Sequence, residues 1–206
     1  MVKNNSINNL NLAGGTLCLD FVNTVDHRKK EPLQDYFLEP NDLIAWGIRL
    51  ELLPVNTSTL AATPKRKDPL KEIITFRELL YRIFLALSNN ETVNADDMKA
   101  FNRYLSQYLS NLRLKESKNG FERDWDLPEE NISRIIAPVL LDAHDLMLSG
   151  RLHRIKECPN CGWLFLDTTK NGRRRWCSMK SCGSNVKALE WYHRRKKGGD
   201  VEESRS

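Results

Sequence analysis

The chain has 206 residues, 40% of them apolar, and a formal net charge of +5, a composition that supports a packed core and excludes disorder throughout. No apolar run approaches the roughly 20 residues of a membrane helix. The first residues also lack the charged-then-apolar pattern of a secretion signal, so we expect a cytoplasmic protein with no membrane partner.

The first predicted elements are a short segment of undecided type and two helices. Residues 16–25 form a short apolar segment broken by polar side chains, and its periodicity does not decide between helix and strand. An Asn-Asp pair can cap a helix over residues 43–53, which Pro54 ends. The clearest helix covers residues 69–88, where a proline opens the first turn and apolar residues repeat at helical spacing.

A hairpin is predicted between two further helices. Apolar residues repeat at helical spacing over residues 94–112. The dipeptide Asn119-Gly120, flanked by apolar and aromatic residues, predicts a β-hairpin with a type I′ turn. A fourth apolar helix is expected over residues 131–149, with Gly150 as its stop.

Four of the five cysteines lie close together towards the C-terminus. Cys158 and Cys161 are separated by two residues, Cys177 and Cys182 by four, and the two pairs by 15. In a chain expected to stay reduced, such clustering indicates a metal site and not a disulfide framework. Four thiolates close the tetrahedral shell of zinc and leave no open position, which predicts a structural Zn²⁺; iron is the alternative metal for four sulfurs. The remaining Cys18 is expected to be a buried small apolar residue.

The residues around the cysteines complete a small module. Residues 163–167 are strand-like, Asn171-Gly172 can turn, and residues 173–176 are expected to return as a second strand. A helix is predicted over residues 184–197. The apolar side chains expected to pack this helix on the metal site are Val186, Leu189 and Tyr192.

The predicted fold class is therefore a mainly helical N-terminal domain with one β-hairpin, followed by a small zinc-ribbon-like module with four cysteine ligands and a terminal helix. We place the division between residues 1–150 and 151–206. The second part holds 14 Lys and Arg against 6 Asp and Glu, a net charge of +8, and the first holds 18 against 21, a net charge of −3. The basic character thus belongs to the predicted zinc module.

This basic surface is the expected footprint of a phosphate backbone. A solvated basic surface without a nucleic-acid partner is the plainer alternative. The candidate nucleic-acid-binding residues are Arg173, Arg174, Arg175, Lys180, Lys187, Arg194, Arg195, Lys196 and Lys197.

The C-terminal motif resembles the CGNR zinc-finger family of bacterial proteins. The matching residues, 158–183, read C-P-N-C-G-W-L-F-L-D-T-T-K-N-G-R-R-R-W-C-S-M-K-S-C-G, and the N-terminal motif G-G-T-L-C-L-D-F-V-N-T, residues 14–24, also resembles this family. The resemblance implies that the four clustered cysteines are zinc ligands. It further implies a transcription regulator with a DNA-binding finger and a helical N-terminal domain suspected of sensing. This chain has Ser184-Asn185 where the family motif has Asn-Arg. The Arg of that motif is the expected contact with a phosphate or a base, and Lys187 or residues 173–175 are the candidates to supply its charge here.

Polar residues gather in and after the N-terminal motif. They either buttress the surrounding helices or line a pocket for a small-molecule effector. The candidate ligand-binding residues are Asp20, Asn23, Thr24, His27 and Arg28.

The leading interpretation is a DNA-binding transcription regulator, with a homodimer expected from the symmetry common among regulators. The first alternative is a zinc-stabilised module that binds a protein or RNA. The second is an enzyme with its site near Asp20, Asn23 and His27. We expect no enzyme, because the four histidines show no ligand spacing and the chain has no phosphate loop, GxSxG motif or dinucleotide fingerprint.

Overall fold

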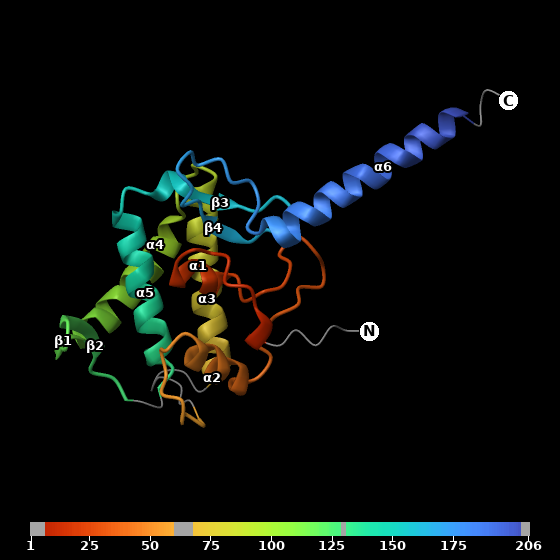
Figure 1. Cartoon of the computed structure of the whole chain (residues 1–206). Coiled ribbons are helices and arrows are strands. Elements are labelled where there is room, and N and C mark those ends of the chain that lie inside the picture. Colours follow the sequence, from red (N-terminus) through yellow and green to blue (C-terminus); the bar gives the residue numbers. More distant parts are fainter. Residues whose placement is uncertain (1–6, 60–67, 129–130, 203–206) are drawn as a thin grey trace.

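The computed structural model describes residues 7–59, 68–128 and 131–202, with side chains described up to residue 196 (Figure 1). Its helices and strands confirm the predicted fold class. In the described residues of the N-terminal part, the α-helices are α1 (Leu17–Val22), α2 (Pro40–Arg49), α3 (Pro69–Ser88), α4 (Ala95–Tyr108) and α5 (Ser133–Leu148). The strands are β1 (Leu112–Ser117), β2 (Gly120–Trp125), β3 (Ile155–Glu157) and β4 (Leu164–Leu166), and the last helix is α6 (Ser184–Glu202). No described helix is both long and apolar enough to span a membrane.

The core of the helical part forms around α1 and α3. Phe21 of α1 lies with its ring centroid 5.5 Å from Trp46 of α2 and 5.7 Å from Phe76 of α3. All three rings are buried, and aromatic rings at such separations attract one another beyond the area that they bury. The short helix α1 is therefore held in the centre of the molecule. Cys18, on the same helix, is buried as expected.

The helix starts follow the capping signals in the sequence, with one correction. The side chains of Asp68 and Asn94 accept hydrogen bonds from the first amides of α3 and α4. The prediction of residues 43–53 for α2 is wrong at both ends. The helix starts at Pro40 because Glu39 and Asp42 form a capping box, and it stops before Glu51, which has a left-handed φ of 58°.

The predicted hairpin is present, but its turn lies one residue earlier than expected. Ser117 pairs with Gly120, so Lys118 and Asn119 are the two turn residues. A type I′ turn requires positive φ at both turn residues, whereas the positive φ falls on Gly120, at 118°. The Asn-Gly signal thus located the hairpin and misplaced its register.

The C-terminal part packs directly on the helical core. The antiparallel pair β3–β4 contacts α1 and α3. The predicted strand over residues 173–176 does not form. Helix α6 points away from the rest of the molecule (Figure 1), and Leu189 and Tyr192 are exposed, which corrects their predicted packing on the metal site.

Candidate metal centre and nucleic-acid interface

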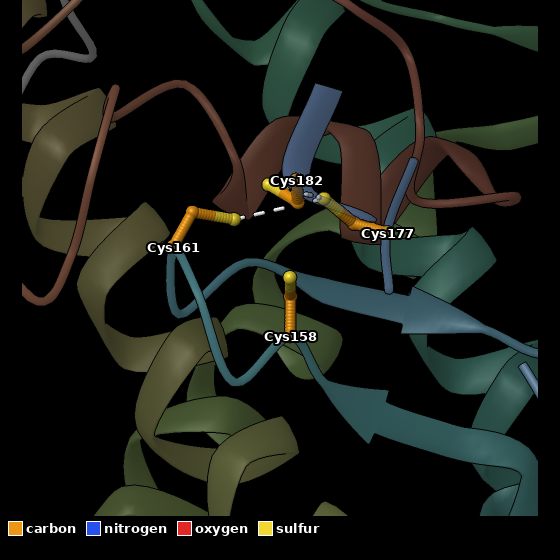
Figure 2. A group of neighbouring side chains, drawn as sticks. All are labelled: Cys158, Cys161, Cys177 and Cys182. Carbon is orange, nitrogen blue, oxygen red and sulfur yellow. Dashed lines mark hydrogen bonds between the residues drawn. The ribbon is translucent and has the colours of Figure 1, made fainter. Parts of the chain in front are cut away.

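The four clustered cysteines come together from three short segments. Cys158 follows β3, Cys161 lies in the turn before β4, Cys177 ends the loop after β4, and Cys182 lies in a π-helical segment, Met179–Gly183, just before α6. Figure 2 shows their side chains converging. All four are buried and none forms a disulfide.

The sulfur atoms have the spacing that a tetrahedral zinc site needs. All four lie within 4.8 Å of one another, and both Cys161–Cys177 and Cys177–Cys182 are 3.6 Å apart. A zinc ion with sulfurs at about 2.3 Å would hold them about 3.8 Å apart. The donor set therefore fits zinc. Bound zinc would supply positive charge to four buried thiolates and cross-link the three segments, with no ligand position left open.

The first knuckle depends on a glycine. The amide of Gly162 donates to the carbonyl of Cys158 over 2.9 Å, and the amide of Cys158 donates to the carbonyl of Trp163 over 2.8 Å. Gly162 has a φ of 76°, and a β-carbon there would lie 3.0 Å from the β-carbon of Arg28. A residue with a side chain would be strained here.

An ion pair between half-buried Lys156 and buried Asp167 organises the loop between β4 and Cys177. Lys156 donates to the Asp167 carboxylate over 2.8 Å and to the carbonyls of Gly172 and Arg174 over 2.6 and 3.0 Å. The same carboxylate accepts from the amide and hydroxyl of Thr169 and from the amide of Arg174. Burial alone would raise the pKa of Asp167, but these donors hold it well below its ordinary value.

This loop separates the three consecutive arginines into two kinds. Arg173 and Arg175 are exposed, whereas Arg174 turns inward. The Arg174 guanidinium donates to the carbonyls of Trp176 and Cys177 and lies 4.7 Å from the centroid of the Phe165 ring. Arg174 therefore supports the loop, and Arg173 and Arg175 remain exposed on its surface.

The other candidate nucleic-acid-binding side chains that are described are exposed: Lys180, Lys187, Arg194, Arg195 and Lys196. Lys197 lies in α6, but its side chain is outside the described part of the chain. From residue 168 to residue 196 the sequence has nine Lys and Arg, and the single acidic residue is Glu190.

Two of the candidate ligand-binding residues, Asn23 and Arg28, contact the zinc module. The side chain of Asn23, which is 0% exposed, donates to the carbonyl of Leu164 over 2.8 Å and accepts from the amide of Leu164 over 3.0 Å. The indole of Trp163 donates to the carbonyl of Val25 over 2.6 Å. The amide of Arg28 donates to the carbonyl of Cys161 over 2.8 Å. These contacts fix both the knuckle and β4 on the end of α1.

The other polar residues of the motif are also engaged within the molecule. The Arg28 guanidinium pairs with Glu78 at 2.9 Å and lies 3.7 Å from the centroid of the Tyr81 ring. Thr24 accepts from Arg77 over 3.2 Å.

Asp20 lies within the N-terminal motif, and His27 lies three residues after it. The Asp20 carboxylate accepts a hydrogen bond from the amide of Gly14 over 2.7 Å. Burial raises the pKa of Asp20 to about 6, although this hydrogen bond acts to lower it. His27 accepts from the amide of Lys29 over 3.3 Å. These contacts agree with the buttressing alternative for the motif.

Replacing Asn23 with Ala should destabilise the protein through its contact with β4. The amide and carbonyl of Leu164 would both lose their partner in a buried place, and each unpaired group costs about 1–3 kcal/mol. We expect a loss on the order of 3 kcal/mol, measured by urea unfolding of the zinc-loaded protein. Asn102→Ala removes the same kind of side chain from an exposed position of α4 and is the matched control. An equal effect of the two changes would contradict the role of Asn23.

Lys156 and Asp167 are the residues that sequence reasoning missed. Lys156 precedes the first cysteine pair and resembles any surface lysine in the sequence. Asp167 carried a usable signal, because an Asp directly after an apolar strand with Thr two residues later is typical of an Asx turn.

Two family models match consecutive parts of the chain. The ABATE model, described as "Putative stress-induced transcription regulator", matches residues 15–150, and the CGNR zinc finger model matches residues 154–195. No curated protein matches the chain. The second match contains all four clustered cysteines and confirms the resemblance drawn from them. Since the first match covers more than half of the sequence, the chain belongs to the ABATE family and carries a CGNR zinc finger over residues 154–195.

Proposed function

We propose that this protein regulates transcription by binding duplex DNA through its zinc module, and that the zinc is structural. The observation that carries the proposal is the one-sided charge of the exposed module, where nine cations face a single carboxylate between residues 168 and 196. Four thiolates with one Zn²⁺ would add two negative charges. The surface would remain strongly basic.

The structural role of zinc is supported by the geometry of the site. The four buried sulfurs lie within 4.8 Å of one another, and a shell of four thiolates has no position for water or substrate. We also infer a binding and not a catalytic role. Asn23, which the alternative enzyme site with Asp20 and His27 would need, is buried and hydrogen-bonded to Leu164.

The N-terminal part is the proposed regulatory part, and its effector and any homodimer belong to this proposal. The description of the matching family, together with the direct contacts of residues 23–28 with the zinc module, supports such a role. A shift of α1 would also move β4, because Asn23 at the end of α1 is hydrogen-bonded to Leu164 of β4. Four cysteines that form no disulfide also suit the proposed location in a reducing cytoplasm.

The test is binding of zinc-loaded protein to labelled random-sequence duplex DNA across a series of salt concentrations. Removal of one phosphate-binding side chain should lower the slope of log K against log salt by about 1. We therefore expect the double variant Arg173→Ala/Arg175→Ala to lower the slope by about 2 and to weaken binding for all sequences alike.

The matched control is Lys115→Ala/Lys118→Ala, which removes two exposed cations from the β1–β2 hairpin, far from α6 in Figure 1. This control should keep the slope of the wild type. Absence of binding at low salt would refute DNA binding. Preference for single-stranded RNA over duplex DNA in competition would favour the RNA-binding alternative.

A further inference from the structure

Helix α6 is an element that lacks a partner within the described chain over most of its length. It contacts the π-helical segment Met179–Gly183 at its base and then extends away from the rest of the molecule (Figure 1). Leu189, Trp191 and Tyr192 are 56%, 54% and 58% exposed. Helices in proteins take most of their stability from tertiary packing. An exposed helix with large apolar side chains therefore indicates an interaction surface.

The side chains of α6 are sorted around its axis. Lys187, Trp191, Arg194 and Arg195 follow one another at spacings of four, seven and eight residues from the first, so they share one stripe of the helix. Half-buried Val186 and Glu190, the one acidic residue between residues 184 and 196, lie to one side of this stripe. The stripe is therefore both basic and aromatic, and it contains no carboxylate.

The charge of this stripe selects the kind of occupant. Between residues 184 and 196 α6 has four cations and one carboxylate. Two such helices brought together would repel each other, which disfavours a second copy of this chain as the partner. A polyanion would instead be attracted along the whole stripe.

We propose that α6 is the recognition helix of this protein and enters the major groove of duplex DNA with the stripe of Lys187, Trp191, Arg194 and Arg195. The proposal rests on the proposed function and adds which element reads the bases. A helix about 10–12 Å across fits the roughly 12 Å width of the major groove. Arg and Lys donate to the acceptors of guanine there, and apolar groups contact the thymine methyl.

A hollow at the base of α6 completes the interface. It has a volume of about 540 Å³ and includes exposed Arg173, Arg175 and Met179 in its lining, together with half-buried Trp176. The Arg175 guanidinium lies 4.6 Å from the centroid of the Trp176 ring. With α6 in the groove, this hollow meets the neighbouring phosphates. The loop thus supplies affinity, and the helix supplies sequence preference.

The stripe has one pair that is already arranged for binding. The Arg195 guanidinium lies 4.8 Å from the centroid of the Trp191 ring. Stacking on an indole limits the orientations of the guanidinium, so less side-chain freedom is lost when it binds a base. Trp191 is therefore a positioning residue for Arg195 as well as an apolar contact.

The experiment compares full-length zinc-loaded variants on a pool of random-sequence duplex DNA. Sequences bound by each protein are read after selection, and hydrogen exchange over residues 184–202 is measured with and without DNA. The stripe variants are Lys187→Ala and Arg195→Ala. The control beside the stripe is Glu190→Gln, and the loop control is Arg173→Ala/Arg175→Ala.

The wild type should select a preferred sequence, and its α6 amides should be protected when DNA is added. One good base contact contributes about 1–3 kcal/mol of discrimination, so each stripe variant should lose preference about 5- to 150-fold at one or two positions. Glu190→Gln should keep the preference of the wild type. The loop variant should bind more weakly and keep the same preferred sequence.

Two results would overturn this inference while leaving DNA binding in place. The first is unchanged preference in the stripe variants, and the second is unchanged exchange of α6 on a DNA that the protein binds. Protection of α6 by self-association, seen as a dimer in sedimentation that Trp191→Ala dissociates, would instead make a second copy the occupant. If the wild type binds no duplex DNA, the proposed function itself fails.

Discussion

Replacing Cys158 with Ser should abolish stoichiometric zinc binding and unfold the C-terminal module. The four sulfurs lie within 4.8 Å of one another in a buried place, and the short β3 and β4 contribute three residues each to the sheet that they form. Zinc binding to such small sites contributes on the order of 10–16 kcal/mol of folding free energy. We expect the same loss from Cys177→Ser and from a strong chelator. Zinc content and circular dichroism measure it.

The fifth cysteine provides the control for this experiment. Cys18 is buried in α1, and it is not one of the four clustered cysteines. Cys18→Ala should therefore keep one zinc per chain and lose only modest stability. Stoichiometric zinc in a Cys158→Ser/Cys177→Ser double variant would show that the metal is bound elsewhere.

Replacing Asp167 with Ala should be the most damaging change outside the zinc ligands. Its carboxylate is buried, pairs with Lys156 and accepts three further hydrogen bonds from Thr169 and Arg174. Removal of one partner from a fully buried pair costs about 3–5 kcal/mol. Lys156 is 30% exposed and keeps the carbonyls of Gly172 and Arg174 as acceptors, so loss of the pair should cost the lower end of this range, and the unpaired amides of Thr169 and Arg174 add to it. We expect this loss in the unfolding free energy of the zinc-loaded protein, measured with urea. DNA binding should weaken as well, since the loop no longer presents Arg173 and Arg175.

The variant Asp167→Asn tests whether charge or shape matters at this position. The amide keeps an oxygen that can accept from the loop amides, but it lacks the charge that Lys156 needs. The unfolding free energy of Asp167→Asn should therefore lie between that of the wild type and that of Asp167→Ala. Thr168→Ala, at the exposed neighbouring position, should leave both stability and DNA binding unchanged. Equal stability of Asp167→Ala and the wild type would contradict the organising role of the ion pair.

The features that short-range chemistry determines could be predicted from the sequence. The start of α3 followed from Pro69 in its first turn, since this preference depends only on the local backbone. The cysteine cluster followed from spacing, because two cysteines around a tight turn reach the same ion. The inward position of Cys18 followed from its apolar neighbours. Each of these depends on residues that are close in the chain.

The features that depend on distant partners could not be predicted. Residues 173–176 look like a strand, but the Arg174 amide and carbonyl are taken by the side chains of Asp167 and Lys156, so no strand ladder forms. Asn23 looked like a candidate ligand residue because Leu164, its partner, lies 141 positions away. A polar residue in an apolar segment indicates a specific contact without saying whether the contact is with a ligand or with the chain.

Asn23 forms hydrogen bonds with both the amide and the carbonyl of Leu164, and this limits how the protein can be divided into parts. Leu164, Phe165 and Leu166 are almost fully buried in the whole chain. A finger excised after α5 would lack Asn23, Val25 and Arg28 together with part of the apolar floor beneath these strands. Fused to another protein, the excised finger would expose the apolar side chains of residues 164–166 and leave the Leu164 amide and carbonyl without their Asn23 partner. The zinc finger should therefore fold in another protein only when α1 and the residues up to Arg28 are transferred with it.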